Sequence, residues 1–80
     1  MKKMTCVQLG GACELELRAE TFDEMAELSR RHGMEMYQKG DPDHLRAMEK
    51  MGELMADSEQ MAAWLDARRA QFDALPEEEA

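Results

Sequence analysis

The chain of 80 residues lacks any apolar run that approaches the roughly 20 residues a membrane-spanning helix needs. It also lacks the apolar core of a signal peptide, because Gln8, Gly10 and Gly11 interrupt the segment after the two N-terminal lysines. We therefore expect a cytoplasmic protein. In that compartment two cysteines are free thiols or metal ligands rather than a structural disulfide.

Basic residues are few and scattered. The 10 Lys and Arg residues stand against 18 Asp and Glu residues, which gives a formal net charge of −8. No basic stripe interleaved with aromatic residues is present. Because nucleic acids and anionic membranes attract proteins chiefly through Lys and Arg, this composition argues against both kinds of partner.

The common catalytic motifs are also missing from the sequence. It has no phosphate-binding loop, no nucleophile elbow and no HExxH motif. A chain of this length forms one small domain with a thin stability margin, and enzyme clefts are usually lined by more chain. We therefore expect a non-enzymatic binding or regulatory protein.

The patterns that are present predict an α+β fold. An N-terminal two-stranded antiparallel β-hairpin, at about 3–18, packs on a helix at about 21–39. A C-terminal helical hairpin follows at about 42–56 and 58–75, which gives a single domain over 1–76 and a solvated acidic tail at 77–80.

Gly10-Gly11 fits a two-residue turn in which both residues have positive φ. That turn pairs Cys6 with Leu15, and the resulting buried face consists of Met4, Cys6, Cys13, Leu15 and Leu17.

Capping signals and apolar spacing predict the three helices. Thr21 and Glu24 form a capping box, and Asp41-Pro42 and Asp57-Ser58 start the next two helices. Gly33 could end or kink the first helix. Residues at helical spacing predict three apolar stripes: Met25, Leu28, His32 and Met36, then Leu45, Met48, Met51, Leu54 and Met55, then Met61, Trp64, Leu65, Arg68, Phe72 and Leu75.

Cys6, Cys13 and His32 are the best candidates for chemistry. The hairpin pairing makes the two cysteines diagonal neighbours, roughly 5–8 Å apart, on the face that the helix carrying His32 should cover. Thiolate and imidazole both bind zinc and copper, so these residues predict a site for zinc or Cu(I), with Met36 or a partner group as a further ligand. His44, in the first turn of its helix, is expected at the solvated surface.

Other interpretations of these residues stay open. The two thiols and the histidine also fit a buried core, since free cysteine is among the most buried residue types. The cysteines also fit a redox pair, if the hairpin brings them close enough for a disulfide.

Methionine is over-represented, with 9 of 80 residues, while aromatic residues make up 5%. Methionine side chains are flexible and form adaptable binding surfaces as well as cores. With Trp64 and Phe72, the methionines of the last two helices could form a groove for a partner helix or a second copy of the chain. The rival hypothesis is therefore a helical interaction module that self-associates, with its cysteines as core.

The first 35 residues or so resemble a family of short prokaryotic proteins known only as a domain of unknown function. The resemblance consists of two cysteines with six residues between them, a Thr-capped helix and a histidine eleven residues after the Thr, at Cys6, Cys13, Thr21, Glu24 and His32. Members often carry another histidine about five residues later, where this chain has Tyr37. The resemblance implies the fold and the key residues, and it implies no activity.

Overall fold

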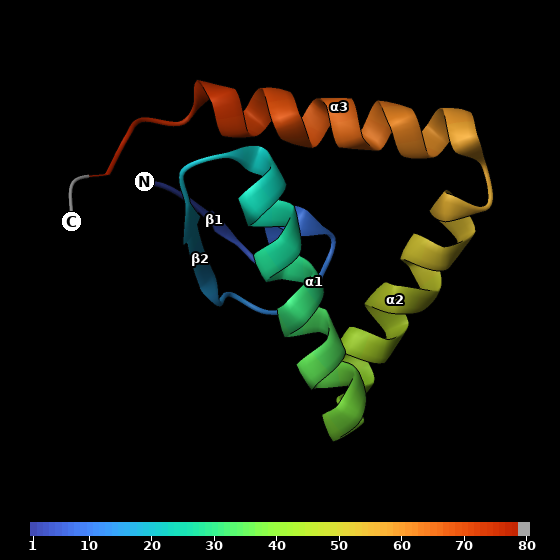
Figure 1. Ribbon diagram of the computed structural model, residues 1–80. Coiled ribbons are helices and arrows are strands. Elements are labelled where there is room, and N and C mark those ends of the chain that lie inside the picture. Colours follow the sequence, from blue (N-terminus) through green and yellow to red (C-terminus); the bar gives the residue numbers. More distant parts are fainter. Residues whose placement is uncertain (79–80) are drawn as a thin grey trace.

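The computed structural model describes residues 1–78. It contains strands β1 (Lys2–Thr5) and β2 (Glu16–Ala19), a 3-10 turn η1 (Val7–Leu9), and helices α1 (Phe22–Lys39), α2 (Pro42–Met55) and α3 (Ser58–Ala74). The α+β prediction is confirmed, because β1 and β2 pair antiparallel, α1 packs against them, and α2 and α3 follow. The three helices form the sides of a triangle with the strands beside α1 (Figure 1), in a slab of 34 × 30 × 15 Å.

The strand register is the predicted one, but the turn is not. The Cys6 N–H donates to the Leu15 carbonyl at 2.9 Å, which continues the β1–β2 pairing. The chain then leaves the sheet through η1, so residues 6–15 form a loop instead of a two-residue turn. Gly10 has a φ of 91°, whereas Gly11 does not have positive φ. Because the loop diverges from the sheet, Leu15 is 46% exposed, and its predicted place on the buried face is wrong.

Each helix begins at its predicted capping residue. The Thr21 hydroxyl accepts a backbone hydrogen bond from the first turn of α1 at 3.2 Å. Asp41 and Asp57 accept in the same way at the starts of α2 and α3. α1 continues through Gly33 and ends at Gly40, whose φ of 70° is the left-handed conformation typical of a helix end. No helix within residues 1–78 is long and apolar enough to cross a membrane.

The hydrophobic core lies where α1 and the C-terminal end of α3 meet the strands. Its buried members are Met4, Leu9, Ala19, Phe22, Met25 and Phe72. The rings of Phe22 and Phe72 pack edge to face with centroids 5.9 Å apart, which fastens the end of α3 to the start of α1. The predicted stripes of the last two helices are less buried than expected, since Met55 is 61% and Leu65 39% exposed.

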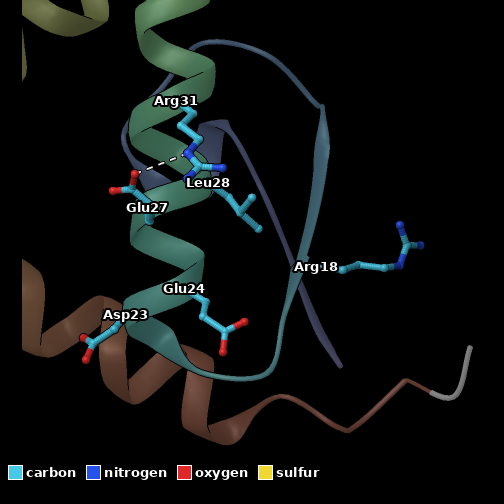
Figure 2. Close-up of a pocket in the computed structure, with 6 residues that line it drawn as sticks. All are labelled: Arg18, Asp23, Glu24, Glu27, Leu28 and Arg31. Carbon is cyan, nitrogen blue, oxygen red and sulfur yellow. Dashed lines mark hydrogen bonds and ion pairs between the residues drawn. The ribbon is translucent and has the colours of Figure 1, made fainter.

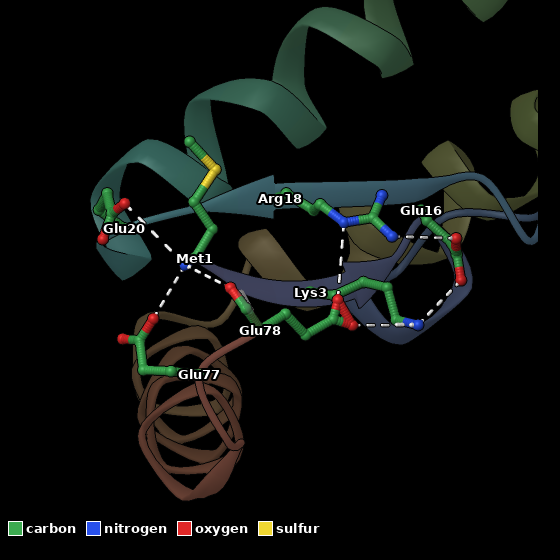
Figure 3. A network of polar contacts seen from close by, with 7 residues as sticks. All are labelled: Met1, Lys3, Glu16, Arg18, Glu20, Glu77 and Glu78. Atoms are coloured by element: carbon green, nitrogen blue, oxygen red, sulfur yellow. Dashed lines mark hydrogen bonds and ion pairs between the residues drawn. The ribbon is translucent and has the colours of Figure 1, made fainter. Parts of the chain in front are cut away.

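The two ends of the described chain meet beside β1 (Figure 3). The Glu78 N–H donates to the Met1 carbonyl at 2.7 Å. Its carboxylate lies 3.4 Å from Lys3 Nζ and 3.6 Å from Arg18 Nε. Glu77 lies 2.9 Å from the amino group of Met1. Ion pairs therefore place these two glutamates of the expected tail beside the strands, while the Glu77 side chain stays 61% exposed. The last two residues of that tail lie outside the described part.

Candidate metal centre

Four side chains converge where the loop after β1 meets α1 and α2: Cys6, Cys13, His32 and His44. One ligand atom from each lies within 4.8 Å of all the others. Cys13 Sγ is 3.3 Å from His32 Nε2, and Cys6 Sγ is 3.5 Å from His44 Nε2. A tetrahedral zinc ion with Zn–S of about 2.3 Å and Zn–N of about 2.0–2.1 Å separates its ligand atoms by about 3.3–3.8 Å. The two S–N distances therefore match the spacing around one tetrahedral ion, and all four donors lie near enough to share it.

The donors come from three separate parts of the chain. Cys6 directly precedes η1, and Cys13 lies near the far end of the same loop. His32 lies in the middle of α1, and His44 lies in the first turn of α2. The two imidazole rings meet edge to face with centroids 5.2 Å apart. The structure thus brings together the three residues singled out from the sequence and adds a fourth.

His44 is the residue that sequence reasoning missed. Its expected place at the solvated surface is wrong, because only 4% of it is exposed. The left-handed Gly40 turns the chain between α1 and α2, and the first turn of α2 then faces the loop instead of the solvent. A signal was present in the sequence. Met48, four residues later and half-buried, lies on the same helical face, so that His44 continues the inward-facing stripe.

Asp41 fixes the orientation of the His44 ring. Oδ2 of Asp41 accepts the His44 backbone N–H at 3.0 Å and lies 2.6 Å from Nδ1 of the ring. Because an ionised carboxylate only accepts, Nδ1 carries a proton, and in the neutral ring the lone pair of Nε2 then faces the thiols. This contact raises the pKa of His44, against the effect of burial, and lowers the pKa of the Asp41 carboxyl. Histidines that bind metals are typically held by a carboxylate in this way.

The loop places backbone N–H groups around both sulfurs. Burial raises the pKa of the Cys6 thiol, and hydrogen bonds from the backbone of Cys13 and Ala12 oppose that rise. Burial also acts to raise the pKa of Cys13, but hydrogen bonds from the Leu15 backbone and the side chains of Cys6 and His44 outweigh it and lower that pKa. Donors aimed at sulfur stabilise the thiolate form, which is the form that binds metals.

Gly11 lies directly against Cys6. Its N–H donates to the Cys6 carbonyl at 2.9 Å. A Cβ atom at this position would overlap Cys6 Sγ and would lie 3.0 Å from the same carbonyl oxygen. Glycine is therefore required here for close approach to the sulfur, and not for the positive φ that the predicted turn demanded.

A narrow cavity of about 110 Å³ reaches the cluster between the loop, α1 and α2. Cys6 and His44 line it together with Gly11, Gly33 and Met48. This cavity gives small species a route to the two most buried donors. The other two donors, from Cys13 and His32, are half-buried.

A larger groove of about 540 Å³ lies between α1 and β2 (Figure 2). Charged side chains line it, and several are already paired within the chain. Glu27 lies 2.7 Å from Arg30 and 3.3 Å from Arg31, and Arg18 lies 3.6 Å from Glu78. These side chains are largely exposed, whereas the sulfur and imidazole atoms of the cluster converge within the fold. We therefore take the cluster as the candidate site.

Comparisons with protein-family models, with curated proteins and with solved structures find no match for this chain. The resemblance of the first 35 residues to a family of unknown function stays a prediction. The chemistry of the site accordingly rests on the geometry of this chain alone: two cysteines and two histidines that cluster within metal-binding distance.

Proposed function

We propose that the protein binds a zinc ion through Cys6, Cys13, His32 and His44, and that this ion stabilises the fold. The observation that supports it is the convergence of four donor atoms within 4.8 Å of one another from three segments distant in sequence. A set of two thiolates and two imidazoles in tetrahedral spacing is typical of structural zinc.

Copper(I) is the alternative ion. It favours soft sulfur ligands, and the half-buried Met36 would be the additional thioether from α1. With His44 as the fourth donor, however, the site needs no methionine ligand. Two imidazoles also make the set harder than the sulfur-rich sets that select Cu(I), so zinc fits better.

A structural role fits the ligand count. Four protein ligands fill a tetrahedral ion and leave no position for water or substrate, unlike catalytic zinc sites. The ion would hold the loop, α1 and α2 together. Helix α2 contributes no residue to the hydrophobic core. Since metal binding to such sites is coupled to folding, the ion would supply stability that this small core does not. We therefore place the protein among non-enzymatic binding or regulatory proteins, in the cytoplasm, where thiols stay reduced.

Thiol redox sensing is the second candidate function. Both cysteines are free thiols, and their sulfurs lie within the same 4.8 Å limit. Hydrogen peroxide would oxidise the two thiols to one disulfide and would itself be reduced to two water molecules. Because the same sulfurs serve both functions, zinc binding and disulfide formation would exclude each other.

Native mass spectrometry with elemental analysis of the reduced protein tests the proposal. We expect one zinc per chain in the wild type, loss of zinc in Cys6→Ser, His32→Ala and His44→Ala, and full retention in the control Met36→Leu. Chelation should lower the melting temperature of the wild type and leave that of Cys6→Ser unchanged. If reduced protein binds neither added zinc nor added Cu(I), the metal function is wrong. Peroxide treatment followed by intact-mass analysis then tests the disulfide.

A further inference from the structure

The chain exposes more surface than a monomer of its size should. Its accessible surface is 5549 Å². Folded monomers of 9.2 kDa expose about 4,900 Å² on average. The excess of roughly 600 Å² approaches the 800 Å² or so that each partner contributes to a standard protein–protein interface. The flat slab shape accounts for the excess, because a layer 15 Å thick has little interior.

An apolar hollow of about 300 Å³ opens within the triangle of helices. Leu9 lines it from the loop, and each helix contributes residues to its walls: Phe22, Ala26, Met51, Met55, Trp64 and Leu65. Gly10 allows the helices to close on the loop, since a Cβ atom there would lie 2.9 Å from Met51 Sδ and 3.1 Å from the Trp64 ring.

The hollow carries almost no charge, although the chain has a net charge of −8. Arg30 is the one charged residue in its lining, and its guanidinium is paired with Glu27 at 2.7 Å. A partner that covers the hollow would therefore desolvate little charge. This is the pattern of an interface centre, where charged residues are depleted and Met and aromatic residues are enriched.

The face that carries the hollow also carries exposed apolar side chains, which suit the hollow of a second copy. Met55 and Leu65 line the hollow, yet they are 61% and 39% exposed, so they lie at its mouth. A two-fold interface places the same patch of both copies in contact. In that arrangement Met55 of one copy can enter the hollow of the other, and the reverse contact forms by symmetry.

We propose that this protein forms a homodimer through the hollow between α1, α2 and α3, with Met55 of each copy seated in the hollow of the other. The contact would bury part of the excess surface of the slab together with the apolar hollow, and burial between copies is one way in which small folds gain stability. None of the four candidate metal ligands lines the hollow, so the dimer contact does not involve them.

Sedimentation over a wide concentration range, on the full chain in reducing buffer, measures this association. We expect the mass to rise with concentration from 9.2 kDa toward twice that value. Trp64 is the single tryptophan and lines the hollow, so its emission should shift to shorter wavelength over the same range. Met55→Lys should raise the dissociation constant by about tenfold or more, as expected for a residue at an interface centre.

Met34→Lys is the matched control, because Met34 is also an exposed helical methionine, at 49%, and lies outside the hollow. It should associate like the wild type, and both variants should keep the zinc content of the wild type. A wild type that stays monomeric at the highest concentration overturns the dimer, whether or not it holds zinc. Equal weakening by both substitutions also overturns it, because the contact would then lie on another surface.

Discussion

Oδ2 of Asp41 binds both the backbone N–H and the ring Nδ1 of His44, at 3.0 and 2.6 Å. One carboxylate oxygen thus caps α2 and orients a candidate metal ligand. The start of the helix and the geometry of the cluster are coupled through these two residues. A change at Asp41 therefore affects both the start of α2 and the orientation of the His44 ring, and a suitable pair of variants can separate the two effects.

Asp41→Asn should weaken zinc binding without melting α2. Asparagine is as good a helix cap as aspartate, so helix content should stay the same. The neutral amide loses the charge that polarises the imidazole, and changes of this kind typically cost about 10–100-fold in metal affinity. Competition with a chromophoric chelator measures the affinity, and circular dichroism measures the helix. Asp57→Asn, the equivalent cap of α3, is the control. Equal zinc affinity in the two variants would contradict the role assigned to Asp41.

Gly11→Ala should damage the site, because the added Cβ overlaps Cys6 Sγ. We expect a loss of about 1–3 kcal/mol in the free energy of unfolding of the zinc-loaded protein, the usual cost of overpacking. Gly52→Ala, in the last turn of α2 with open space around it, should instead stabilise the protein by about 0.5–1 kcal/mol. Urea unfolding measures both. A Gly11→Ala protein as stable as the wild type would mean that the loop is free to move away from Cys6.

The elements of the fold follow from local signals in the sequence. Thr21, Asp41 and Asp57 begin their helices because their side chains satisfy backbone N–H groups within the next three residues. Gly40 ends α1 because it adopts positive φ without steric cost. Alternation of charged and apolar residues along β2 sets the register of the strand pair. Each of these interactions spans only a few residues, and local pattern therefore predicts it.

The deviations arise from contacts between distant segments. The carbonyl of Cys6 accepts from the N–H groups of both Leu9 and Gly11, and this replaces the tight turn with a loop. His44 becomes buried only because α2 folds back on that loop. Glu78 lies 3.4 Å from Lys3, which is 75 residues earlier in the chain. Helical spacing places His44 on the same face as Met48, but no pattern in the sequence shows that this face packs on the loop or that the two chain ends meet. The first three site residues were therefore predicted, and the fourth was not.

Phe72→Ala should be the most damaging single change in α3. Phe72 is buried, packs on Phe22 at 5.9 Å, and lies under the Lys2 ammonium, 5.1 Å from its ring centre. Loss of a buried phenylalanine typically costs about 3–5 kcal/mol, which is a large part of the stability of a domain this small. Tyr37→Ala removes an aromatic ring that is 59% exposed and should change stability by no more than about 0.5 kcal/mol. Thermal unfolding compares the two, and equal losses would mean that α3 is not anchored through Phe72.

The ion pair between Lys3 and Glu16 should make the free energy of unfolding depend on pH in the acid range. The two side chains lie 3.1 Å apart across the strand pair. A hydrogen bond and charge attraction from Lys3 lower the pKa of Glu16 below its ordinary value of 4.5. A carboxyl whose pKa is lowered on folding contributes stability that is present above its ordinary pKa, and that is lost as the pH falls through the lowered value.

In Lys3→Gln the pKa of Glu16 should move back toward 4.5, although Arg18 still lowers it in part. Carbon NMR titration of the Glu16 carboxyl measures this shift, and Lys39→Gln in the last turn of α1 should leave it unchanged. Because the pair is exposed, 1 M salt should bring the wild-type value toward that of the variant. An identical Glu16 titration in Lys3→Gln and the wild type would show that the ion pair does not persist in solution.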